Sequence, residues 1–590
     1  MLFVLNIGFA IPLGYVLYWY SIPNKYTMAI YHFNTQFVPG NVDIERNIIN
    51  QSIRAILEMH LRHPSWKFNL ELSGSGLELM NNSYPEVFQM LNTCVSTGQC
   101  ELILSPYSEM LSIAFPSYDM AKAINFSIQV ANALHIKRSS VLFLQENQFH
   151  PAFPLLRQFG YDIFVVSGDT FHYYGIPWQY PLQNWSFYGE SIDLVVYPSD
   201  LIFGTPQIRG NVQYYFRWHQ DGEAANTNSQ SGAGPEAFVV DPTKQKMHEK
   251  RAQNLEKLGY RFLTITEWVN LCKSRGEPFY HPLETFLPDA TWSMYETHGP
   301  MMWMGYNWEN YGINGSENDG YYRALNYRTR NLLLAVETLY NHYRGSLVEE
   351  AKIIENLTEA WKHQILAEVS DSTGWHPLPE EWEYTIYHSS LAKNFCDAII
   401  KHIKLNTSIS QFQVFTHNKT IRTNLTEFVD PIETIIPETA LPTGFHIFIN
   451  GTTYSSHFFN VTWGEFTYYK IKLNITPSTN FKIQFKFDTL IHNISYSPSL
   501  AENTSIQLSP VYPNPVYLSL SNGFIYANGF GIIKNCSAHH TGLVWNQGKL
   551  YFEEHNQSHY IQPEFILTTY PINKALFLAN LINTYPCLKL

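Results

Sequence analysis

Charged residues are scarce in this sequence. Asp, Glu, Lys and Arg make up 15% of its 590 residues, whereas about 25% is typical of globular proteins. The net charge is −12 at pH 7, and Lys and Arg form no run. Because a nucleic acid partner requires clustered basic side chains that contact phosphates, this composition argues against nucleic acid binding. A surface with few charges must also be hydrated by other groups.

Cysteine is scarce as well. The six cysteines include no CxxC pair and show no zinc-ligand spacing, so the sequence predicts neither a metal site nor a cofactor. Two interpretations of the cysteines remain open. Cys94 and Cys100 close a short disulfide loop, as an exported protein permits, or all six are free, buried side chains.

An apolar segment stands at the start of the sequence. Residues 2–20 contain few polar side chains, and at about 1.5 Å per residue the segment up to Pro23 just spans a hydrocarbon layer of about 30 Å. We therefore expect residues 1–25 to act as a membrane anchor or an export signal. The alternative is a buried first helix of a soluble domain.

Triplets of the form NxS/T, with no proline at the middle position, are frequent. They begin at sixteen of the 46 asparagines, and ten of the sixteen follow residue 400. Glycans on such asparagines would hydrate a surface that lacks charges. We therefore expect a glycoprotein outside the cell or at its surface, although a chain merely rich in Asn, Ser and Thr would show the same triplets. The asparagines are at positions 50, 81, 125, 184, 314, 356, 406, 418, 424, 450, 460, 474, 493, 503, 535 and 556.

Strand and helix patterns alternate in the first half of the chain. This alternation predicts a parallel sheet with crossover helices, here an α/β barrel over residues 26–320. Apolar residues at helical spacing occupy residues 44–63, 84–98, 118–136 and 242–259. Short β-branched or aromatic runs occupy residues 27–34, 66–74, 100–106, 140–147, 163–168, 193–198, 214–221 and 261–266.

The remainder of the chain divides into two further regions. Residues 321–405 contain three long amphipathic segments, which predict a helical domain. After residue 406 short alternating runs are separated by Pro, Gly and Asn, a texture typical of an all-β domain and here of a sandwich over residues 406–590.

Two carboxyl groups stand at the ends of separate predicted strands. Glu146 follows the apolar run VLFL, and Asp221 lies in WHQDGEAAN beside His219 and Glu223. Hydrolysis of a glycosidic bond requires two carboxyl groups, one that protonates the leaving oxygen and one that attacks or activates water. Polar residues at the C-terminal ends of barrel strands, here Asn34, Glu101, Glu146 and Asp221, are where such folds place their active sites.

The order of the motifs resembles that of glycoside hydrolase family 57. YHFNTQF is similar to the family's first motif, and Gly98, Gln99 and Glu101 to its second. LFLQEN, with Glu146, matches the third motif, and His219 to Glu223 match the HxDGE string of the fourth. The fifth motif is matched at residues 367–371, with Trp375 slightly displaced.

This resemblance implies an incomplete (β/α)7 barrel, followed by a helical region that completes the active site and by a β-rich domain. It also implies a retaining mechanism in which Glu146 is the nucleophile and Asp221 is the general acid/base. The substrate would be an α-glucan outside the cell, of the starch, glycogen or pullulan type. Further residues would bind the sugar, namely His32, Glu101, Trp218, His219, Asp371 and Trp375.

The sequence departs from the family pattern in two places. Asn34 and Thr35 stand where the family has histidine and glutamine, and AANTNSQSGAG replaces the usual hydrophobic continuation after the fourth motif. Four alternatives therefore stay open: an α-glucan transglycosylase, an α-galactosidase-type relative, a metal-dependent α-mannosidase-like enzyme, and a carbohydrate-binding glycoprotein that has kept the fold without catalysis.

Overall fold

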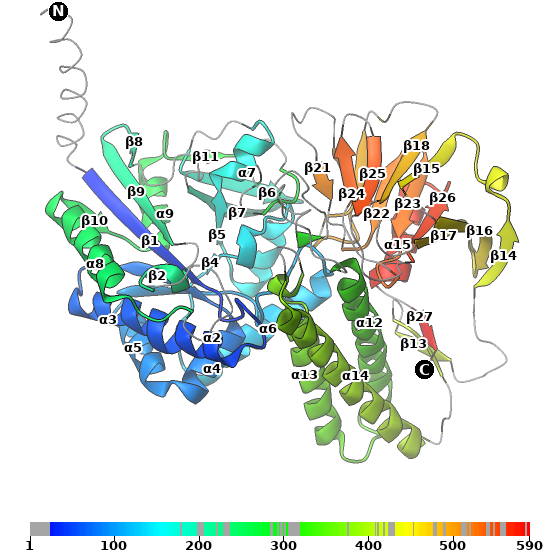
Figure 1. Cartoon of the computed structure of the whole chain (residues 1–590), viewed down its shortest axis with the longest axis horizontal. Coiled ribbons are helices and arrows are strands. Elements are labelled where there is room, and N and C mark those ends of the chain that lie inside the picture. The colour runs from blue at the N-terminus through cyan, green and yellow to red at the C-terminus, as the bar shows by residue number, and fades with distance from the viewer. Residues whose placement is uncertain are drawn as a thin grey trace, which may run out of the picture.

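The computed structural model describes most of residues 24–589 (Figure 1). The description omits residues 177–179, 198–205, 220–221, 228–236, 284–286 and 374–376, and between 292 and 318 it includes only Met294, Gly299, Trp303 and Met304. Shorter gaps interrupt residues 408–586. The expected anchor, residues 1–25, lies outside the described residues up to its last two positions, since strand β1 begins at Asn24.

Parallel strands among the described residues form the first part of the fold, seven of them in two main rows and an eighth, β10 Tyr260–Phe262, beside β1 (Figure 1). The seven lie in two sheets, in the neighbour orders β9-β1-β2-β3 and β4-β5-β7, which is the arrangement of an incomplete barrel. Short strands extend these sheets, namely β6 Leu182–Phe187, β8 Gln207–Arg209, β10 Tyr260–Phe262 and β11 Tyr280–Pro282. The seven strands are β1 Asn24–Phe33, β2 Phe68–Leu72, β3 Cys100–Leu104, β4 Val141–Leu142, β5 Ile163–Ser167, β7 Glu190–Tyr197 and β9 Val212–His219.

Helices connect these strands and cover the sheets, because apolar faces on both sides of a parallel sheet must be buried. Each helical pattern expected from the sequence corresponds to an observed helix, and the barrel also contains the shorter helices α4 Gly74–Ser83, α7 Gly168–Tyr173 and α9 Ile265–Arg275. The predicted ones are α2 Val42–Asn47, which continues through the π-helix η1 Ile48–Ile53 into α3 Arg54–Arg62, then α5 Pro85–Ser96, α6 Ser117–Ala133 and α8 Pro242–Lys257.

The two parallel sheets meet where β3 lies beside β4 without forming a hydrogen-bonded ladder. Side chains join the sheets at both ends of this seam. At the N-terminal end of β3, Glu101 accepts hydrogen bonds from Ser139, before β4, and from Thr266 on α9. At the C-terminal end, Gln148 after β4 binds the segment that follows β3, donating to the carbonyl of Met110 (3.0 Å) and accepting from the amide of Ile113 (3.1 Å).

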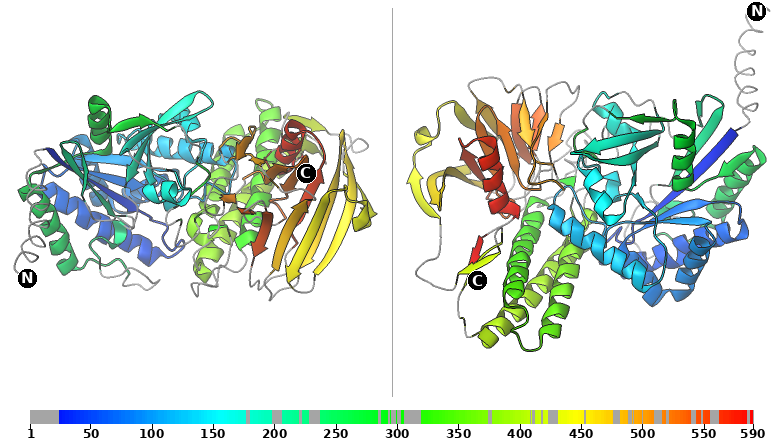
Figure 2. Two further views of the ribbon diagram at one scale, coloured as in Figure 1. Left: turned by 90° about the horizontal axis from the view of Figure 1, so that it is seen from above. Right: turned by 180° about the vertical axis from the view of Figure 1, so that it is seen from behind.

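The helical region consists of three long helices, α12 Asp319–Tyr343, α13 Glu350–Ala367 and α14 Pro379–Thr407. Figure 2 shows them between the barrel and the β-rich region. A single β-bridge joins Met110 of the barrel to Val369 at the end of α13. This bridge brings the chain that follows α13 to the C-terminal ends of the barrel strands.

Antiparallel sheets make up the C-terminal region (Figure 2). The larger has the strand order β14-β16-β17-β26-β23-β22-β19-β20, and the smaller has the order β15-β18-β25-β24-β21. Together they confirm the predicted β-rich region, and a small third sheet, β13-β12-β27, includes the last described residues. Helix α15 Ile572–Ala579 packs on the larger sheet. The strands are β12 Gln413–Phe415, β13 Thr420–Arg422, β14 Ile432–Ile436, β15 Phe445–Gly451, β16 Tyr454–Trp463, β17 Phe466–Ile475, β18 Phe481–Phe487, β19 Ile494–Tyr496, β20 Ile506–Leu508, β21 Val516–Leu518, β22 Phe524–Ala527, β23 Phe530–Lys534, β24 Leu543–Asn546, β25 Lys549–Glu554, β26 Glu564–Thr568 and β27 Cys587–Lys589.

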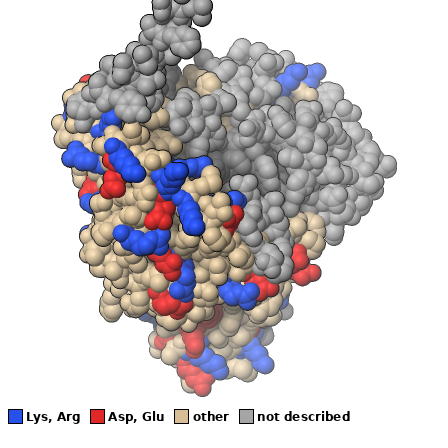
Figure 3. All heavy atoms as spheres, turned by 60° about the vertical axis from the view of Figure 1, so that its left-hand side comes forward, with Lys and Arg blue, Asp and Glu red and all other residues tan. Residues whose placement is uncertain are grey.

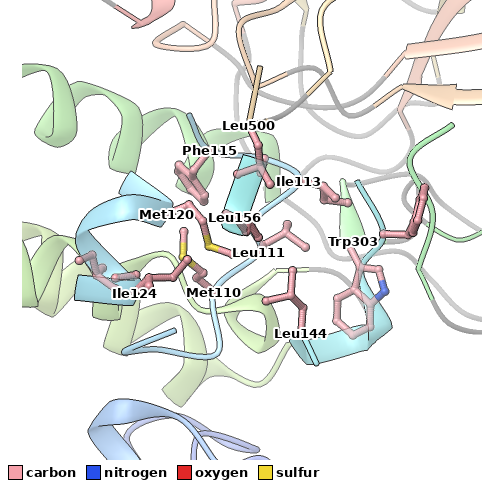
Figure 4. Close-up of a cluster of buried hydrophobic side chains, with 14 of the residues drawn as sticks. Met110, Leu111, Ile113, Phe115, Met120, Ile124, Leu144, Leu156, Trp303 and Leu500 are labelled. Atoms are coloured by element: carbon pink, nitrogen blue, oxygen red, sulfur yellow. The ribbon is translucent and has the colours of Figure 1, made fainter. Parts of the chain in front are cut away.

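A continuous apolar core joins all three regions. Figure 4 shows part of it around the segment that follows β3, where Leu500 of the β-rich region packs beside barrel side chains. The other labelled residues are Met110, Leu111, Ile113, Phe115, Met120, Ile124, Leu144, Leu156 and Trp303. Trp303 is thus a buried core residue.

A buried ion pair crosses the same junction. Arg330 of α12 donates from Nε to both carboxylate oxygens of Asp119 on α6, at 2.9 and 2.7 Å, and both side chains are fully buried. Its Nη1 donates to the carbonyls of Asn583 (3.4 Å) and Thr584 (3.2 Å) in the π-helix η10 Asn580–Thr584. One guanidinium group therefore binds the barrel, the helical region and the β-rich region.

The five cysteines that the structure describes are free and buried. The Cys94–Cys100 disulfide that the sequence permitted is therefore absent, because both thiols are occupied in apolar packing beneath α5 and β3. No helix in the described part of the chain has the length and apolar character needed to cross a membrane. On the face in Figure 3, Lys and Arg side chains lie among Asp and Glu side chains. Ion pairs at the surface of the described residues include Arg62–Glu249 and Lys67–Glu267.

Candidate active site

The candidate site lies at the C-terminal edge of the parallel strands. In the ladder between β1 and β9, Tyr31 is opposite His219, and in the ladder between β1 and β2, His32 is opposite Glu71. The strands are parallel, so the chain segments that follow them, including those that carry Glu109 and Glu146, leave the sheets at the same edge. Residues far apart in the sequence therefore meet here.

His32 lies at this edge. The described charged groups that shift its pKa are all carboxyl groups. Its Nδ1 contacts the Glu71 carboxylate, and both side chains are buried. Burial alone would lower the pKa of His32, but the charge of Glu71, with smaller effects from Glu109 and Glu223, raises that pKa to about 10. At neutral pH His32 is therefore an imidazolium paired with Glu71.

Glu109 adds a further buried carboxyl group. It follows β3, is 1% exposed, and neither of its carboxyl oxygens has a hydrogen-bond partner among the described residues. Burial raises the pKa of Glu109 well above its usual range, and the neighbouring Glu71 raises it further, whereas His32 opposes the rise. Burial and the neighbouring carboxylate therefore favour the protonated form of Glu109.

The helical region supplies one side of the site. Asn34, directly after β1, donates from Nδ2 to Asp371 at 2.6 Å, and Asp371 lies in the 3-10 turn Ser370–Ser372 after α13. In the first turn of α14, Glu381 is buried next to Asp371, and burial, with a smaller contribution from the Asp371 charge, raises the pKa of Glu381 to about 9. The predicted site residue Asp371 thus does reach the barrel edge from the helical region.

Glu146 lies in a strained turn after β4. Glu146 and Asn147 both have left-handed backbone conformations, with φ of 58° and 45°, which L-residues adopt at a cost of about 1–3 kcal/mol each. The side chain of Asn147 holds the turn. Its Nδ2 donates to the carbonyl of Val165 on β5 (3.0 Å), and its Oδ1 accepts from the main-chain amide of Ser167 (2.7 Å). Backbone strain maintained by buried hydrogen bonds is typical of functional sites, and here it fixes the carboxyl group of Glu146 at the edge.

The HxDGE string leaves β9 next to β1. Gly222 lies so close to β1 that a Cβ atom on it would be 2.5 Å from the carbonyl oxygen of His32. Ser52, on η1, donates to the carbonyl of Glu223 at 2.7 Å, and Glu223 is buried. Only glycine fits between Asp221 and Glu223 in this arrangement, so Gly222 sets the path of the string past His32.

Four of the predicted site residues cannot be placed fully. Asp221 and Trp375 lie outside the described residues, and Trp218 and His219 are described only through their backbone at the end of β9.

The prediction that Glu101 lies at the C-terminal end of its strand is wrong. Glu101 is the second residue of β3 and lies at the N-terminal end of the strand, the end opposite the site, where it contacts Ser139 and Thr266. The motif GQCE precedes the strand rather than ending it, because the apolar run that forms β3 follows the glutamate. The carboxyl group that reaches the site from this strand belongs to Glu109, five residues after the strand ends.

Sequence reasoning missed Glu71 and Glu109. Glu71 interrupts an otherwise apolar strand, FNLEL, and all five of its residues are buried, so a buried charge was the available signal. Glu109 follows the strand LIL within SPYSEM, a polar stretch at a strand end of the kind that identified Glu146. Among the described residues no group of three or more His, Cys, Asp or Glu side chains is arranged to hold a metal ion.

Comparisons with known proteins agree with this site. Residues 28–226 match glycosyl hydrolase family 57. The chain is 23% identical over 345 residues to an alpha-amylase of Pyrococcus furiosus, a match that covers 55% of this chain and 50% of the relative. It is 26% identical over 154 residues to a 4-alpha-glucanotransferase of Thermococcus litoralis, covering 26% of this chain and 23% of the relative. The chain thus spans half or less of the length of these curated relatives.

A solved structure resembles the chain over nearly its whole length. It is an alpha-mannosidase from Enterococcus faecalis, with a TM-score of 0.59 and 8% identity, and the alignment covers 96% of this chain and 90% of that protein. At this identity the likeness concerns the fold alone. The matching family segment contains β1 to β9 and ends just after the HxDGE string, at residue 226. The barrel is thus the part of the chain that matches glycosyl hydrolase family 57.

Proposed function

We propose that the protein is a retaining glycoside hydrolase that cleaves α-glucosidic bonds in neutral α-glucans, with Glu146 as nucleophile and Asp221 as general acid/base. The observation that carries the proposal is the turn at Glu146. Its left-handed backbone is held by the buried side chains of Asn147 and Gln148 at the edge from which the HxDGE string also departs.

A double displacement needs one carboxylate that forms a covalent glycosyl-enzyme and one carboxyl group that first protonates the leaving oxygen and then deprotonates water. Glu146 and Asp221 follow different strands of the parallel fold, so they can approach a glycosidic bond from two sides. Asp221 precedes Gly222, whose contact with the His32 backbone fixes the path of the string. Buried neighbouring carboxyl groups favour the protonated state that an acid catalyst requires.

The charges at the site favour a neutral substrate. Glu71, Asp371 and Glu223 surround the edge, while the single imidazolium of His32 is already paired with Glu71. A phosphorylated or carboxylated sugar would meet carboxylates without a free cation, which is unfavourable in a buried site. The names of the relatives, alpha-amylase and 4-alpha-glucanotransferase, support α-glucans as the substrate class.

The test compares Glu146→Gln and Asp221→Asn with the native protein on starch, pullulan and maltooligosaccharides. We expect each variant to lose at least about a hundredfold in kcat/KM, since each removes an essential carboxyl function. Glu355→Gln, a substitution on the exposed face of α13, is the matched control. The same experiment with a mechanism-based label should yield a glycosylated peptide that contains Glu146.

The remaining alternatives correspond to distinct outcomes. Longer oligosaccharides formed in place of reducing ends would identify a transglycosylase, and cleavage of α-galactosides alone would identify a different glycosidase. Activity lost with a chelator and restored by zinc would indicate a metal enzyme. If the native protein binds maltooligosaccharides without cleaving them, or if both carboxyl variants keep full activity, the proposed mechanism fails.

We further propose that the protein works outside the cell as a glycoprotein, tethered through or exported by residues 1–25. Among the side chains that the structure describes, none of the NxS/T asparagines is buried, whereas ten other asparagines are, such as Asn69 and Asn583. Glycans need accessible attachment sites, so this distribution supports the proposal. Intact mass before and after chemical deglycosylation tests the modification, and cell fractionation tests the location. A protein of unmodified mass in the cytosol would refute both.

A further inference from the structure

Glu109 is fixed at both sides of its main chain. Its amide donates to the side-chain oxygen of Gln36, which follows β1, at 3.0 Å. Its carbonyl accepts from the amide of Ser370, which follows α13, at 2.8 Å. Such contacts to the barrel and to the helical region leave the Glu109 side chain with little freedom to move away from the site.

The carboxyl group of Glu109 is poorly satisfied, because the Ser73 hydroxyl group is close enough to lower its pKa but forms no hydrogen bond of ordinary geometry with it. Both carboxyl oxygens of Glu109 are buried and without a hydrogen bond in the described part of the protein. Nearby, the same holds for Oε1 of Glu71 and for the hydroxyl groups of Ser108 and Ser370. Buried polar atoms without partners are rare in native proteins, and a group of them at one place requires an explanation.

The charges around Glu109 exclude a stable carboxylate. Glu71 on β2 and Asp371 after α13 raise the pKa of Glu109 in addition to its burial, while His32 on β1 and the hydroxyl group of Ser73 at the start of α4 act in the opposite direction. His32 is already engaged by Glu71. Unlike a carboxylate, a protonated carboxyl group carries a hydrogen-bond donor, and it does so here without adding charge.

We propose that Glu109 is a substrate-binding residue, a neutral carboxylic acid that donates its proton in a hydrogen bond to a hydroxyl group of a neutral sugar. The unpartnered oxygens around it accept or donate to further hydroxyl groups of the same sugar. This inference rests on the proposed function, since it takes the sugar to be part of an α-glucan. It adds to Glu146 and Asp221 a residue that selects uncharged sugars.

The experiment uses two substitutions at one position. Glu109→Gln keeps a neutral donor and acceptor of nearly the same shape, so kcat/KM on maltoheptaose should stay within about threefold of the native value. Glu109→Ala removes the donor, so kcat/KM should fall about tenfold or more, mainly through KM, as expected for a lost hydrogen bond. Circular dichroism verifies that both variants are folded, and Glu355→Gln again serves as the matched control.

A second measurement does not depend on activity. The infrared difference spectrum at pH 7, native protein minus Glu109→Gln, should contain the carbonyl stretch of a protonated carboxylic acid. The difference between the native protein and Glu355→Gln should lack it, because other protonated groups such as Glu381 contribute equally to all three spectra. If the native protein cleaves no α-glucan, the proposed function fails, and a missing acid band would refute the inference separately. If the protein is active but Glu109→Gln is as impaired as Glu109→Ala, the neutral-donor role is wrong. The role is also wrong if neither variant differs from the native protein.

Discussion

The ion pair at the junction of the three regions offers a sharp test of what holds the molecule together. Arg330→Met removes two hydrogen bonds to Asp119 and two to the carbonyls of η10. Breaking a buried pair by removing one partner costs about 3–5 kcal/mol. Nη2 of Arg330 has no partner among the described residues, so the guanidinium group is incompletely compensated in the native protein. We therefore take the lower value, about 3 kcal/mol.

Hydrogen exchange measured by mass spectrometry can detect this loss locally, which matters because a chain with several regions need not unfold in one step. A cost of about 3 kcal/mol corresponds to about a hundredfold faster exchange of the protected amides. We expect the acceleration in peptides from α6, α12 and η10, which meet at Arg330. Arg344→Met is the control, because Arg344 is 69% exposed and contacts Glu350 only at 3.9 Å. Its loss should change exchange by less than about fivefold.

The double variant Arg330→Met, Asp119→Leu makes the reasoning refutable. If the cost comes from an unpaired buried charge, removing Asp119 as well should recover part of the protection lost in the single variant. Exchange in Arg330→Met that is indistinguishable from the Arg344→Met control would show that the ion pair does not stabilise the junction. The stated mechanism, an unpaired buried charge, would be wrong if the double variant exchanged faster than the combined effects of Arg330→Met and Asp119→Leu measured singly.

Three further predictions concern the site. Gly222→Ala should reduce kcat/KM at least about a hundredfold while leaving most of the fold intact, because its Cβ would displace the main chain at His32; unchanged kinetics would contradict the close packing. Asn147→Ala should lower kcat by about tenfold or more and change KM less, since it releases the strained turn at Glu146. Steady-state kinetics on maltoheptaose measure the two constants separately. For His32, burial lowers the pKa but Glu71 raises it to about 10. Because this pKa is raised, His32 stabilises the folded protein fully below the unfolded pKa of about 6.5, and this contribution is lost as the pH rises toward 10. The urea midpoint of unfolding should therefore fall over this pH window in the native protein and much less in Glu71→Gln.

Periodicity in the sequence was sufficient for the order of the elements. A strand such as β5, IFVVS, consists almost entirely of apolar residues that leave little choice of structure, and all four predicted barrel helices occur. The resemblance to the family then identified Glu146 and the HxDGE string. Both depend on short segments in which polar residues follow an apolar run, a pattern that is visible in one dimension.

What periodicity does not reveal is which end of a strand faces the site. Glu101 lies near the start of β3, and Glu109 follows its end. The motif pattern predicted that Glu101 faces the site, whereas Glu109 does, because a strand's direction within the barrel depends on the complete topology. The pairing of His32 with Glu71 likewise depends on register between β1 and β2. A buried glutamate in an apolar strand signals that a partner exists but does not identify it.

The seam between β3 and β4 has a mechanical consequence. Within either sheet, separating two strands would break a ladder of main-chain hydrogen bonds. At the seam, the described residues form side-chain hydrogen bonds, such as those of Gln148 and Glu101, and a main-chain hydrogen bond from Ser139 to Leu102. Each of these contributes only about 0.5–1.5 kcal/mol, so the two half-shells can rotate slightly against each other at far lower cost than any sheet can be opened. Glu109 and Glu146 lie on opposite sides of this seam, and the spacing between the proposed sugar-binding acid and the proposed nucleophile is therefore the dimension of the site that we expect to adjust most easily to a long polymer.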